Sequence, residues 1–316
     1  MPLPVGAKAE AIVLPGNPYD YWNPVTATHF IGREQELMRA YQAIEEQHSI
    51  SLVGDHLIGK SSFLNALENL YSGQGRKVVK LSGLGHESRS VQHFVEAITG
   101  ISSENEADRA ANVLAHWAAQ NTQGQQAPLL LIDDAEGCFQ RFPLRFFERL
   151  RGMLYKLVLV FASSQDLDLI KADNHPVETV SPLEARLEII RLGLLDENAA
   201  AIIWQLGVGV MERQDEEILS LWAGRHPYYL KLFGANLWQA RKKQIAIETV
   251  LDQVYDDTRR HLRQIWNSLT TTEQQILKNS LDGRAVKRRS LRLRGLVTDS
   301  GQLFGQVLRE WLEQEL

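Results

Sequence analysis

The sequence predicts an α/β fold in which a parallel sheet is followed by a purely helical unit and then by a small unit of helices and one hairpin. Three observations predict this order. Apolar runs of strand length alternate with amphipathic helical segments up to about residue 193, a pattern typical of parallel βαβ units. Beyond that residue, apolar positions recur only at helical spacing. From about residue 255, a capping box and a hairpin signal mark a third unit.

The first unit can be divided in chain order. Residues 1–28 are rich in Pro, Asn and aromatic residues and are interpreted as an irregular arm. The core then occupies residues 29–192. Its strands are expected at Ile50–Val53, Lys77–Leu81, Leu129–Ile132, Leu157–Phe161 and Leu187–Ile190. Its helices are expected at Phe30–Gln47, Ser61–Leu70, Val91–Ile98, Ala107–Ala119 and Phe142–Leu154.

Two further units follow the core. Residues 193–254 form a helical lid, with helices expected at Asp196–Leu206, Glu216–Trp222, Pro227–Arg241 and Ala246–Leu251. In residues 255–316, a capping box at Thr270–Glu273 starts a helix and a basic helix comes next. Residues 299–301 then separate two short apolar segments as in a hairpin, and a last helix contains Trp311. This order resembles a winged helix.

Composition and charge narrow the classes of protein that the chain can represent. Apolar residues make up 44% and charged residues 23% of the 316 residues, as in a globular chain with a sizeable core. The net charge of −5 argues against a polycation that coats nucleic acid. The lone Cys138 excludes a disulfide framework or a cysteine zinc cluster. No apolar run has the length of a membrane span, and Met1–Val5 shows no secretion signal, so a cytoplasmic protein without a membrane partner is expected.

Residues 54–61 carry the strongest chemical signal. They read GDHLIGKS and match GxxxxGK[ST], between an expected strand and an expected helix. Glycines let such a loop wrap so that its N–H groups and the positive end of the helix face a phosphate. Lys60 would reach the terminal phosphates and act in catalysis, and the hydroxyl of Ser61 would ligate Mg²⁺. The expected nucleotide contacts of this loop are Gly54, Asp55, His56, Leu57, Ile58, Gly59, Lys60, Ser61 and Ser62.

Acidic residues after the third expected strand supply the second part of such a site. Asp133 leaves that strand and is expected to hold Mg²⁺ through water. Asp134 is the candidate base that orients the attacking water, and Glu136 is a second candidate for this role. After the fourth strand, the hydroxyl of Ser164 is placed to contact the γ-phosphate or the water, and capping of the next turn is an equal alternative.

A segment before the first strand points to a family. Phe30, Ile31, Gly32 and Arg33 precede a helix and lie about twenty residues before the phosphate loop. They resemble the segment that folds over adenine in AAA+ and STAND ATPases, which implies that these four residues contact the nucleotide. Further matches at residues 181–183, 192–195 and 224–230 extend the resemblance to bacterial and archaeal STAND-type P-loop ATPases over about residues 15–315.

The resemblance implies a nucleotide-dependent switch with slow ATPase activity, serving defence or regulation. Such ATPases hold ADP between the core, the lid and the winged helix at rest, and ATP with Mg²⁺ opens them into a homo-oligomer. His226 and Pro227 would then approach the nucleotide from the lid, although Pro227 would start a helix in any case. Typical members continue into sensor or effector domains, so a separate partner chain is expected here. The candidates for an arginine that acts in trans are Arg149, Arg151, Arg186 and Arg191.

A basic segment supports a different hypothesis. Residues 255–316 hold eleven Lys and Arg against eight Asp and Glu. The alternative function is that of a DNA-binding AAA+ ATPase, similar to origin-binding proteins or transposition regulators. A solvated helix face explains the charges equally well, and a third hypothesis is an adaptor that keeps nucleotide as a structural ligand. The candidate DNA contacts are Lys287, Arg288, Arg289, Arg292 and Arg294.

Overall fold

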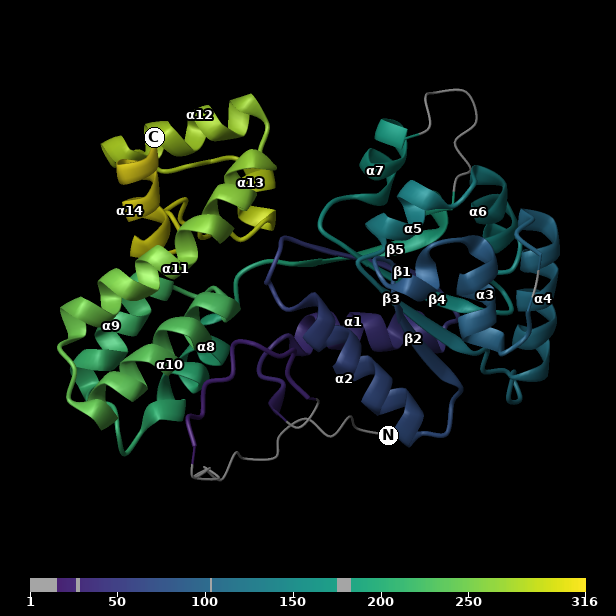
Figure 1. The fold of residues 1–316 in the computed structure, drawn as a ribbon, viewed down its shortest axis with the longest axis horizontal. Coiled ribbons are helices and arrows are strands. Elements are labelled where there is room, and N and C mark those ends of the chain that lie inside the picture. The colour runs from purple at the N-terminus through teal and green to yellow at the C-terminus, as the bar shows by residue number, and fades with distance from the viewer. Residues whose placement is uncertain (1–15, 27–28, 103, 175–182) are drawn as a thin grey trace.

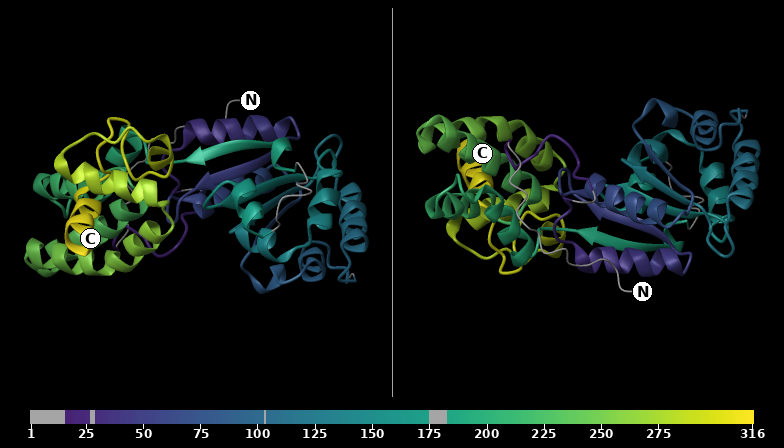
Figure 2. Two further views of the ribbon diagram at one scale, coloured as in Figure 1. Left: turned by 90° about the horizontal axis from the view of Figure 1, so that it is seen from above. Right: turned by 90° about the horizontal axis from the view of Figure 1, so that it is seen from below.

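The computed structural model describes residues 16–26, 29–102, 104–174 and 183–316. The chain forms two lobes, one built around the sheet and the other from helices α8 to α14 (Figures 1 and 2). The predicted fold class, a parallel-sheet α/β core followed by a helical lid and a C-terminal unit, is confirmed. In the described ranges no helix combines the length and the apolar character that crossing a bilayer requires.

Five parallel strands form the sheet, in the order β2-β3-β4-β1-β5. They are β1 (Ser49–Gly54), β2 (Val78–Ser82), β3 (Leu129–Asp133), β4 (Val158–Ser163) and β5 (Leu187–Leu192). Every residue of β1, β3 and β4 is buried, which explains why β3 and β4 are nearly continuous apolar runs in the sequence. β1 lies between β4 and β5, so Val53 is opposite both Ser163 and Arg191. The carboxyl ends of all five strands therefore meet at one edge.

Helices cover both faces of the sheet. Helices α1 (Glu34–Glu45) and α2 (Lys60–Gly73) cover one face, where α1 lies over β1 and β5 and α2 shares a core cluster with Leu129 and Leu131 of β3. The opposite face, which includes Leu130 and Ile132, shares a core cluster with five helices. These are α3 (Val91–Thr99), α4 (Ala107–Gln120), α5 (Glu136–Arg141), α6 (Leu144–Arg151) and α7 (Leu167–Asn174). Successive strand residues point to opposite faces, so one apolar run supplies both cores.

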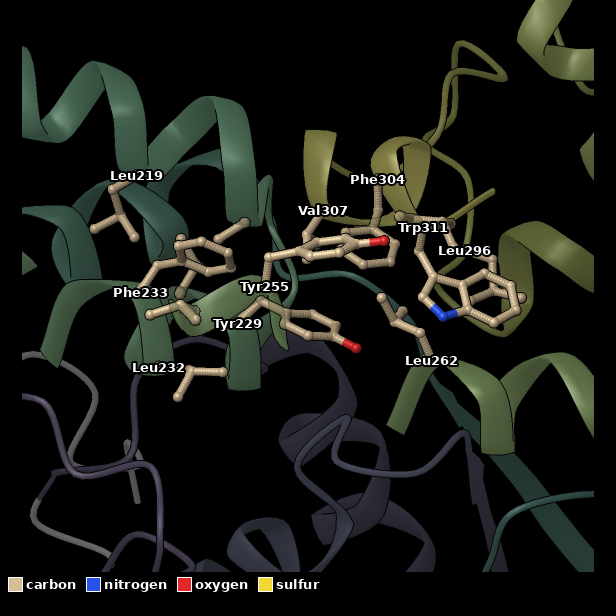
Figure 3. Packing of buried hydrophobic residues seen from close by; sticks show 14 of the residues in the cluster. Leu219, Tyr229, Leu232, Phe233, Tyr255, Leu262, Leu296, Phe304, Val307 and Trp311 are labelled. Atoms are coloured by element: carbon tan, nitrogen blue, oxygen red, sulfur yellow. The ribbon is translucent and has the colours of Figure 1, made fainter. Parts of the chain in front are cut away.

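The second lobe contains the lid and the C-terminal unit. The lid consists of α8 (Glu197–Trp204), α9 (Arg213–Ala223), α10 (Pro227–Lys243) and the first part of α11 (Ile247–Asn267). The C-terminal unit consists of α12 (Thr271–Asn279), α13 (Arg289–Leu293), a hairpin and α14 (Gln306–Glu315). A single hydrophobic cluster runs from Leu219 and Phe233 in the lid to Phe304 and Trp311 in the C-terminal unit (Figure 3). The two parts of this lobe therefore share a core.

Several elements differ from the sequence-based expectation. The helix expected at Phe142–Leu154 spans only Leu144–Arg151, because Phe142, the residue before Pro143, is held extended and α6 starts after the proline. The helix expected at Ala246–Leu251 continues to Asn267 and crosses residue 254, since its buried face continues through Thr258 and Leu262. The hairpin closes through one antiparallel bridge, Val297 with Leu303.

The basic helix is also shorter than expected. Only Arg289–Leu293 is helical. The N–H of Val286 donates to the carbonyl oxygen of Gly301 at 2.8 Å, which holds the preceding segment against the hairpin. The basic residues before Arg289 therefore lie in a loop.

Candidate functional site

The phosphate loop connects β1 to α2 at the carboxyl edge of the sheet. A Cβ on Gly54 would lie 2.6 Å from Cγ2 of Ile58 and 3.0 Å from the carbonyl oxygen of Leu192, so only glycine fits there. Gly59 has a φ of +104°, a left-handed conformation that glycine adopts readily. Since α2 starts at the next residue, its unpaired N–H groups and positive end lie at the loop, as an anion site requires.

Lys60 and Asp55 are held by the backbone of the loop itself. The buried ammonium of Lys60 donates to the carbonyl oxygens of Gly54 at 2.9 Å and Asp55 at 3.1 Å. Burial lowers the pKa of Lys60, and nearby carboxylates, that of Glu136 foremost, oppose this shift. Oδ1 of Asp55 accepts the N–H of His56 at 2.8 Å. A phosphate would offer the ammonium of Lys60 a charged oxygen, which is a stronger acceptor than a carbonyl.

Three carboxylates from the end of β3 to the start of α5 lie near Lys60, in addition to that of Asp55. Asp133 ends β3, and its Oδ1 accepts the N–H of Asp134 at 3.1 Å. Glu136 starts α5 and accepts the N–H of Ser164, so the backbone of Ser164 also meets this group. Burial raises the pKa of Asp134, and the carboxylates of Asp133 and Glu136 raise it further. This crowding of negative charge suits a hard divalent cation.

The residues present fit a magnesium ion that is shared with a nucleotide. Over the described ranges, no group of three or more His, Cys, Asp or Glu side chains forms a metal site made by protein alone. Mg²⁺ bound with nucleotides takes few protein ligands and completes its shell with phosphate oxygens and water. Ser61 at the start of α2 and Asp133 at the end of β3 are the two that would hold it.

A cavity of about 270 Å³ opens beside the phosphate loop. Its walls come from the N-terminal arm, the loop, the start of α2 and the lid. It extends from Lys60 in the phosphate loop to Pro227 at the start of α10. Many of the expected nucleotide contacts line it: Phe30, Ile31, Arg33, His56, Leu57, Ile58, Gly59, Lys60, Ser61, Ser62, Asp134 and Pro227.

Other expected contacts do not line this cavity, among them Gly32 and His226. A Cβ on Gly32 would lie 2.6 Å from Cβ of Ala199, so Gly32 permits close packing on α8. The ring of His226 is buried between Tyr229 and Phe304, with ring centroids 4.7 and 5.2 Å away. Burial holds the pKa of His226 well below its usual range. The remaining expected contacts outside the lining are Gly54, Asp55, Asp133, Glu136 and Ser164.

Arg33 connects the phosphate loop to the linker before the lid. Its guanidinium donates to the carbonyl oxygens of Gly193, Leu194 (3.2 Å) and Ile58 (3.4 Å). Only 5% of Arg33 is exposed. This burial lowers its pKa, and Glu36 at 3.3 Å opposes the shift.

Arg294 brings the C-terminal unit to the phosphate loop. Its Nε donates to Oδ2 of Asp55 at 2.7 Å, and its Nη1 donates to the carbonyl oxygen of Ser268 at 3.2 Å. Nη1 of Arg292 lies 3.6 Å from Oδ1 of Asp299 in the hairpin. The remaining basic residues of the segment face solvent, and in the part of the chain that the structure describes they form no ion pair. They are Arg284, Lys287, Arg288 and Arg289.

The four arginines considered for action in trans lie in different places. Arg191 is at the carboxyl end of β5, where Asp166 binds it at 2.7 Å. It also lines a second cavity of about 450 Å³ between α1 and the C-terminal unit. Arg149 is bound by an acidic residue of α4 at 3.3 Å. Arg151 ends α6, and Arg186 lies just before β5.

Several lining residues of the 270 Å³ cavity were not assigned a role from the sequence, among them Tyr21, Trp22, Tyr228 and Lys231. The available signal was the clustering of aromatic residues in the arm, which the sequence pattern identified only as an irregular segment.

Comparison with known proteins agrees with this geometry. Residues 19–176, half of the chain, match the family model described as Novel STAND NTPase 1. No curated protein matches the sequence. The Walker-type ATPase PABY2304 of Pyrococcus abyssi superposes with a TM-score of 0.63 at 11% identity, over 94% of this chain and 99% of that chain. The ORC2 protein of Aeropyrum pernix, solved as ADPNP and ADP complexes, superposes with a TM-score of 0.54 at 12% identity, over 91% and 96%. At these identities the superpositions show a shared fold.

Proposed function

Because the chain belongs to the Novel STAND NTPase 1 family, we propose that it is an ATP-driven molecular switch whose bound nucleotide controls its assembly. In this proposal, ATP and ADP occupy the cavity beside the phosphate loop, ATP is hydrolysed slowly, and the ATP state forms a homo-oligomer that signals to a partner chain.

The contact between Arg294 and Asp55 is the observation that carries the proposal. Asp55 is 2% exposed and lies within the phosphate loop. One of its carboxylate oxygens holds the N–H of His56, and the other holds Arg294 of the C-terminal unit. A phosphate that reorganises the loop would change the surroundings of Asp55 and hence this ion pair. The lid and the C-terminal unit share a core (Figure 3), so the second lobe would respond as a body.

The catalytic roles follow from the surroundings of each side chain. Lys60 would neutralise the terminal phosphates, and Mg²⁺ held by Ser61 and Asp133 would supply further charge stabilisation. Asp134 lines the cavity and is the proposed base that orients the water. Glu136 holds the N–H of Ser164 and would position the end of β4.

Particle mass measured by mass photometry tests the switch. We expect the wild-type protein to gain mass with ATP, compared with ADP, and the Lys60→Ala variant to keep one mass with both. An unchanged wild-type mass would refute nucleotide-controlled assembly. Nucleotide binding without turnover or assembly would instead favour an adaptor.

A second candidate function, DNA binding, is favoured by the four solvent-facing basic residues at positions 284 and 287–289. Arg292 and Arg294 face acidic groups of the protein, so the phosphate contacts would come from the loop before α13. This candidate predicts duplex binding that weakens steeply with salt and is lost when Lys287, Arg288 and Arg289 are changed to Glu. The control is Arg213→Glu on α9, whose side chain is 92% exposed. Fluorescence anisotropy of labelled duplex DNA measures the outcome.

A further inference from the structure

A short segment of the arm passes from the lid to the phosphate-loop helix. This strap, residues 17–25, is fixed at the lid end because Asn17 donates to the carbonyl oxygen of Ala235 at 2.9 Å and the Tyr19 hydroxyl to that of Trp204 at 3.0 Å. Close packing supports this anchor, since a Cβ on Gly234 would lie 2.5 Å from the Tyr19 ring.

The other end of the strap is fixed to α2. The N–H of Val25 donates to the hydroxyl of Ser62 at 3.1 Å, and Asn65 donates to the carbonyl oxygen of Val25 at 3.2 Å. The strap therefore connects the lid to α2, and its middle lines the nucleotide cavity. In Figure 1 this purple segment runs between the lid helices α8 and α10 and the sheet lobe.

The middle of the strap presents an exposed indole ring on a fixed turn. Asp20 accepts the N–H groups of Trp22 at 3.0 Å and Asn23 at 3.2 Å, and Nδ2 of Asn23 also donates to it. The turn is thereby held, yet Trp22 is 80% exposed. Exposed apolar groups that gather at a cavity mark a ligand-binding groove, and Trp22 lies at such a cavity.

Two tyrosines continue this aromatic surface into the lid. The rings of Tyr21 and Trp22 lie 4.9 Å apart, and Tyr228 meets Tyr21 edge-on at 6.4 Å. All three residues line the same cavity as Lys60. Lys231, one turn beyond Pro227 on α10, also lines it and supplies a cation opposite Asp20.

We propose that Tyr21, Trp22 and Tyr228 form the base subsite of the nucleotide cavity, with Trp22 stacking on a purine base. This inference rests on the proposed nucleotide function and adds to it the group that recognises the base. Aromatic side chains bind bases through their π faces, and alanine substitution of one stacking residue typically weakens binding by about tenfold. Lys231 donates to an acceptor of the base or the ribose at the same end.

Calorimetric titration with MgATP and with inorganic tripolyphosphate tests the subsite. Tripolyphosphate carries the phosphates without a base. We expect Trp22→Ala to weaken MgATP binding about tenfold, to leave tripolyphosphate binding unchanged, and to cost more affinity for ATP than for CTP. Trp22→Phe should restore most of the ATP affinity, because it keeps a stacking ring. The matched control is Tyr155→Ala, since Tyr155 is 71% exposed and lies before β4, whose carboxyl end carries the site.

The outcomes separate this inference from the proposed function. Wild-type affinity of Trp22→Ala for MgATP overturns the subsite while leaving nucleotide binding intact. Equal losses for MgATP and tripolyphosphate also overturn it, because Trp22 would then act on the loop and not on the base. If the wild-type protein binds neither ligand, the proposed function fails together with the subsite.

Discussion

Asp134 and Glu136 have different surroundings although one residue separates them. Asp134 lines the cavity, while the carboxylate of Glu136 accepts the N–H of Ser164. We expect Asp134→Asn to slow ATP hydrolysis about 100-fold with little change in ATP affinity. Glu136→Gln should keep more activity, because its amide oxygen still accepts from Ser164. Phosphate release and calorimetric ATP binding measure the two quantities, and a reversed ranking would make Glu136 the base.

The same assignment has a consequence for pH dependence. A base acts in its ionised form, and burial together with Asp133 and Glu136 raises the pKa of Asp134. The acidic limb of the kcat/KM profile should therefore lie above the ordinary pKa of 3.8 for Asp, and activity should be lost as the pH falls through it. A profile that is flat down to that pH would show that Asp134 does not act as the base.

Arg33 was expected to contact the nucleotide, and its guanidinium also binds three backbone carbonyls. Replacing it with Met would leave these buried acceptors without a donor, at a cost of about 1–3 kcal/mol in the free energy of unfolding. Urea denaturation measures this loss. The control is Arg39→Met, because Arg39 is 52% exposed and a surface ion pair contributes under about 1 kcal/mol. Equal losses in the two variants would contradict the structural role of Arg33.

At the scale of elements, a hydrogen bond between Tyr229 of α10 and His261 of α11 joins two helices, and burial keeps the histidine neutral. The ring of His261 accepts or donates a hydrogen bond at 2.8 Å with the Tyr229 hydroxyl. Burial, followed by His56, lowers its pKa from 6.5 to about 4, and Asp55 opposes the shift. Below pH 6.5, His261 therefore binds a proton in the unfolded chain, whereas in the folded chain it stays neutral until the pH approaches 4. This contribution to stability, roughly 3 kcal/mol, is complete above pH 6.5 and lost as the pH falls towards 4.

Thermal unfolding between pH 7.5 and pH 4.5 tests this expectation. The midpoint of the wild-type protein should fall with pH, and His261→Phe should reduce the fall because it removes the titrating group. His116→Gln is the matched control, since His116 is exposed on α4. If His261→Phe and the wild-type protein show the same pH dependence, His261 does not control it.

The elements differ in how far the sequence could predict them, for physical reasons. The central strands and the phosphate loop are contiguous, and their burial and turn chemistry leave a local pattern, so β1 and β3 lie where they were expected. The length of α11 was missed because it depends on packing against both the lid and α14. The base subsite joins Trp22 to Tyr228, and no local pattern records that these two residues share a cavity.

At the scale of the whole molecule, two arginines and the strap connect the lobes. Arg33 binds the carbonyls of the linker before the lid, and Arg294 reaches Asp55 across 239 residues of sequence. Each connection ends at the phosphate loop or within a few residues of it. We therefore expect the relative position of the lobes to depend on what occupies the loop, and variants that remove one connection at a time measure this dependence.

Arg294→Ala cuts the connection that the switch proposal depends on. Asp55 would lose its charged partner, and the C-terminal unit would lose its ion pair with the phosphate loop. A buried charge that loses its partner raises the energy of the arrangement in which the C-terminal unit contacts the phosphate loop. We therefore expect assembly at about tenfold lower ATP concentration and faster release of a fluorescent ADP analogue. Lys287→Ala is the matched control, since Lys287 is exposed and, over the described residues, forms no ion pair. Arg294→Lys keeps the charge and should fall between the two. A folded Arg294→Ala protein with the ATP dependence of the wild type would show that this contact does not restrain the switch.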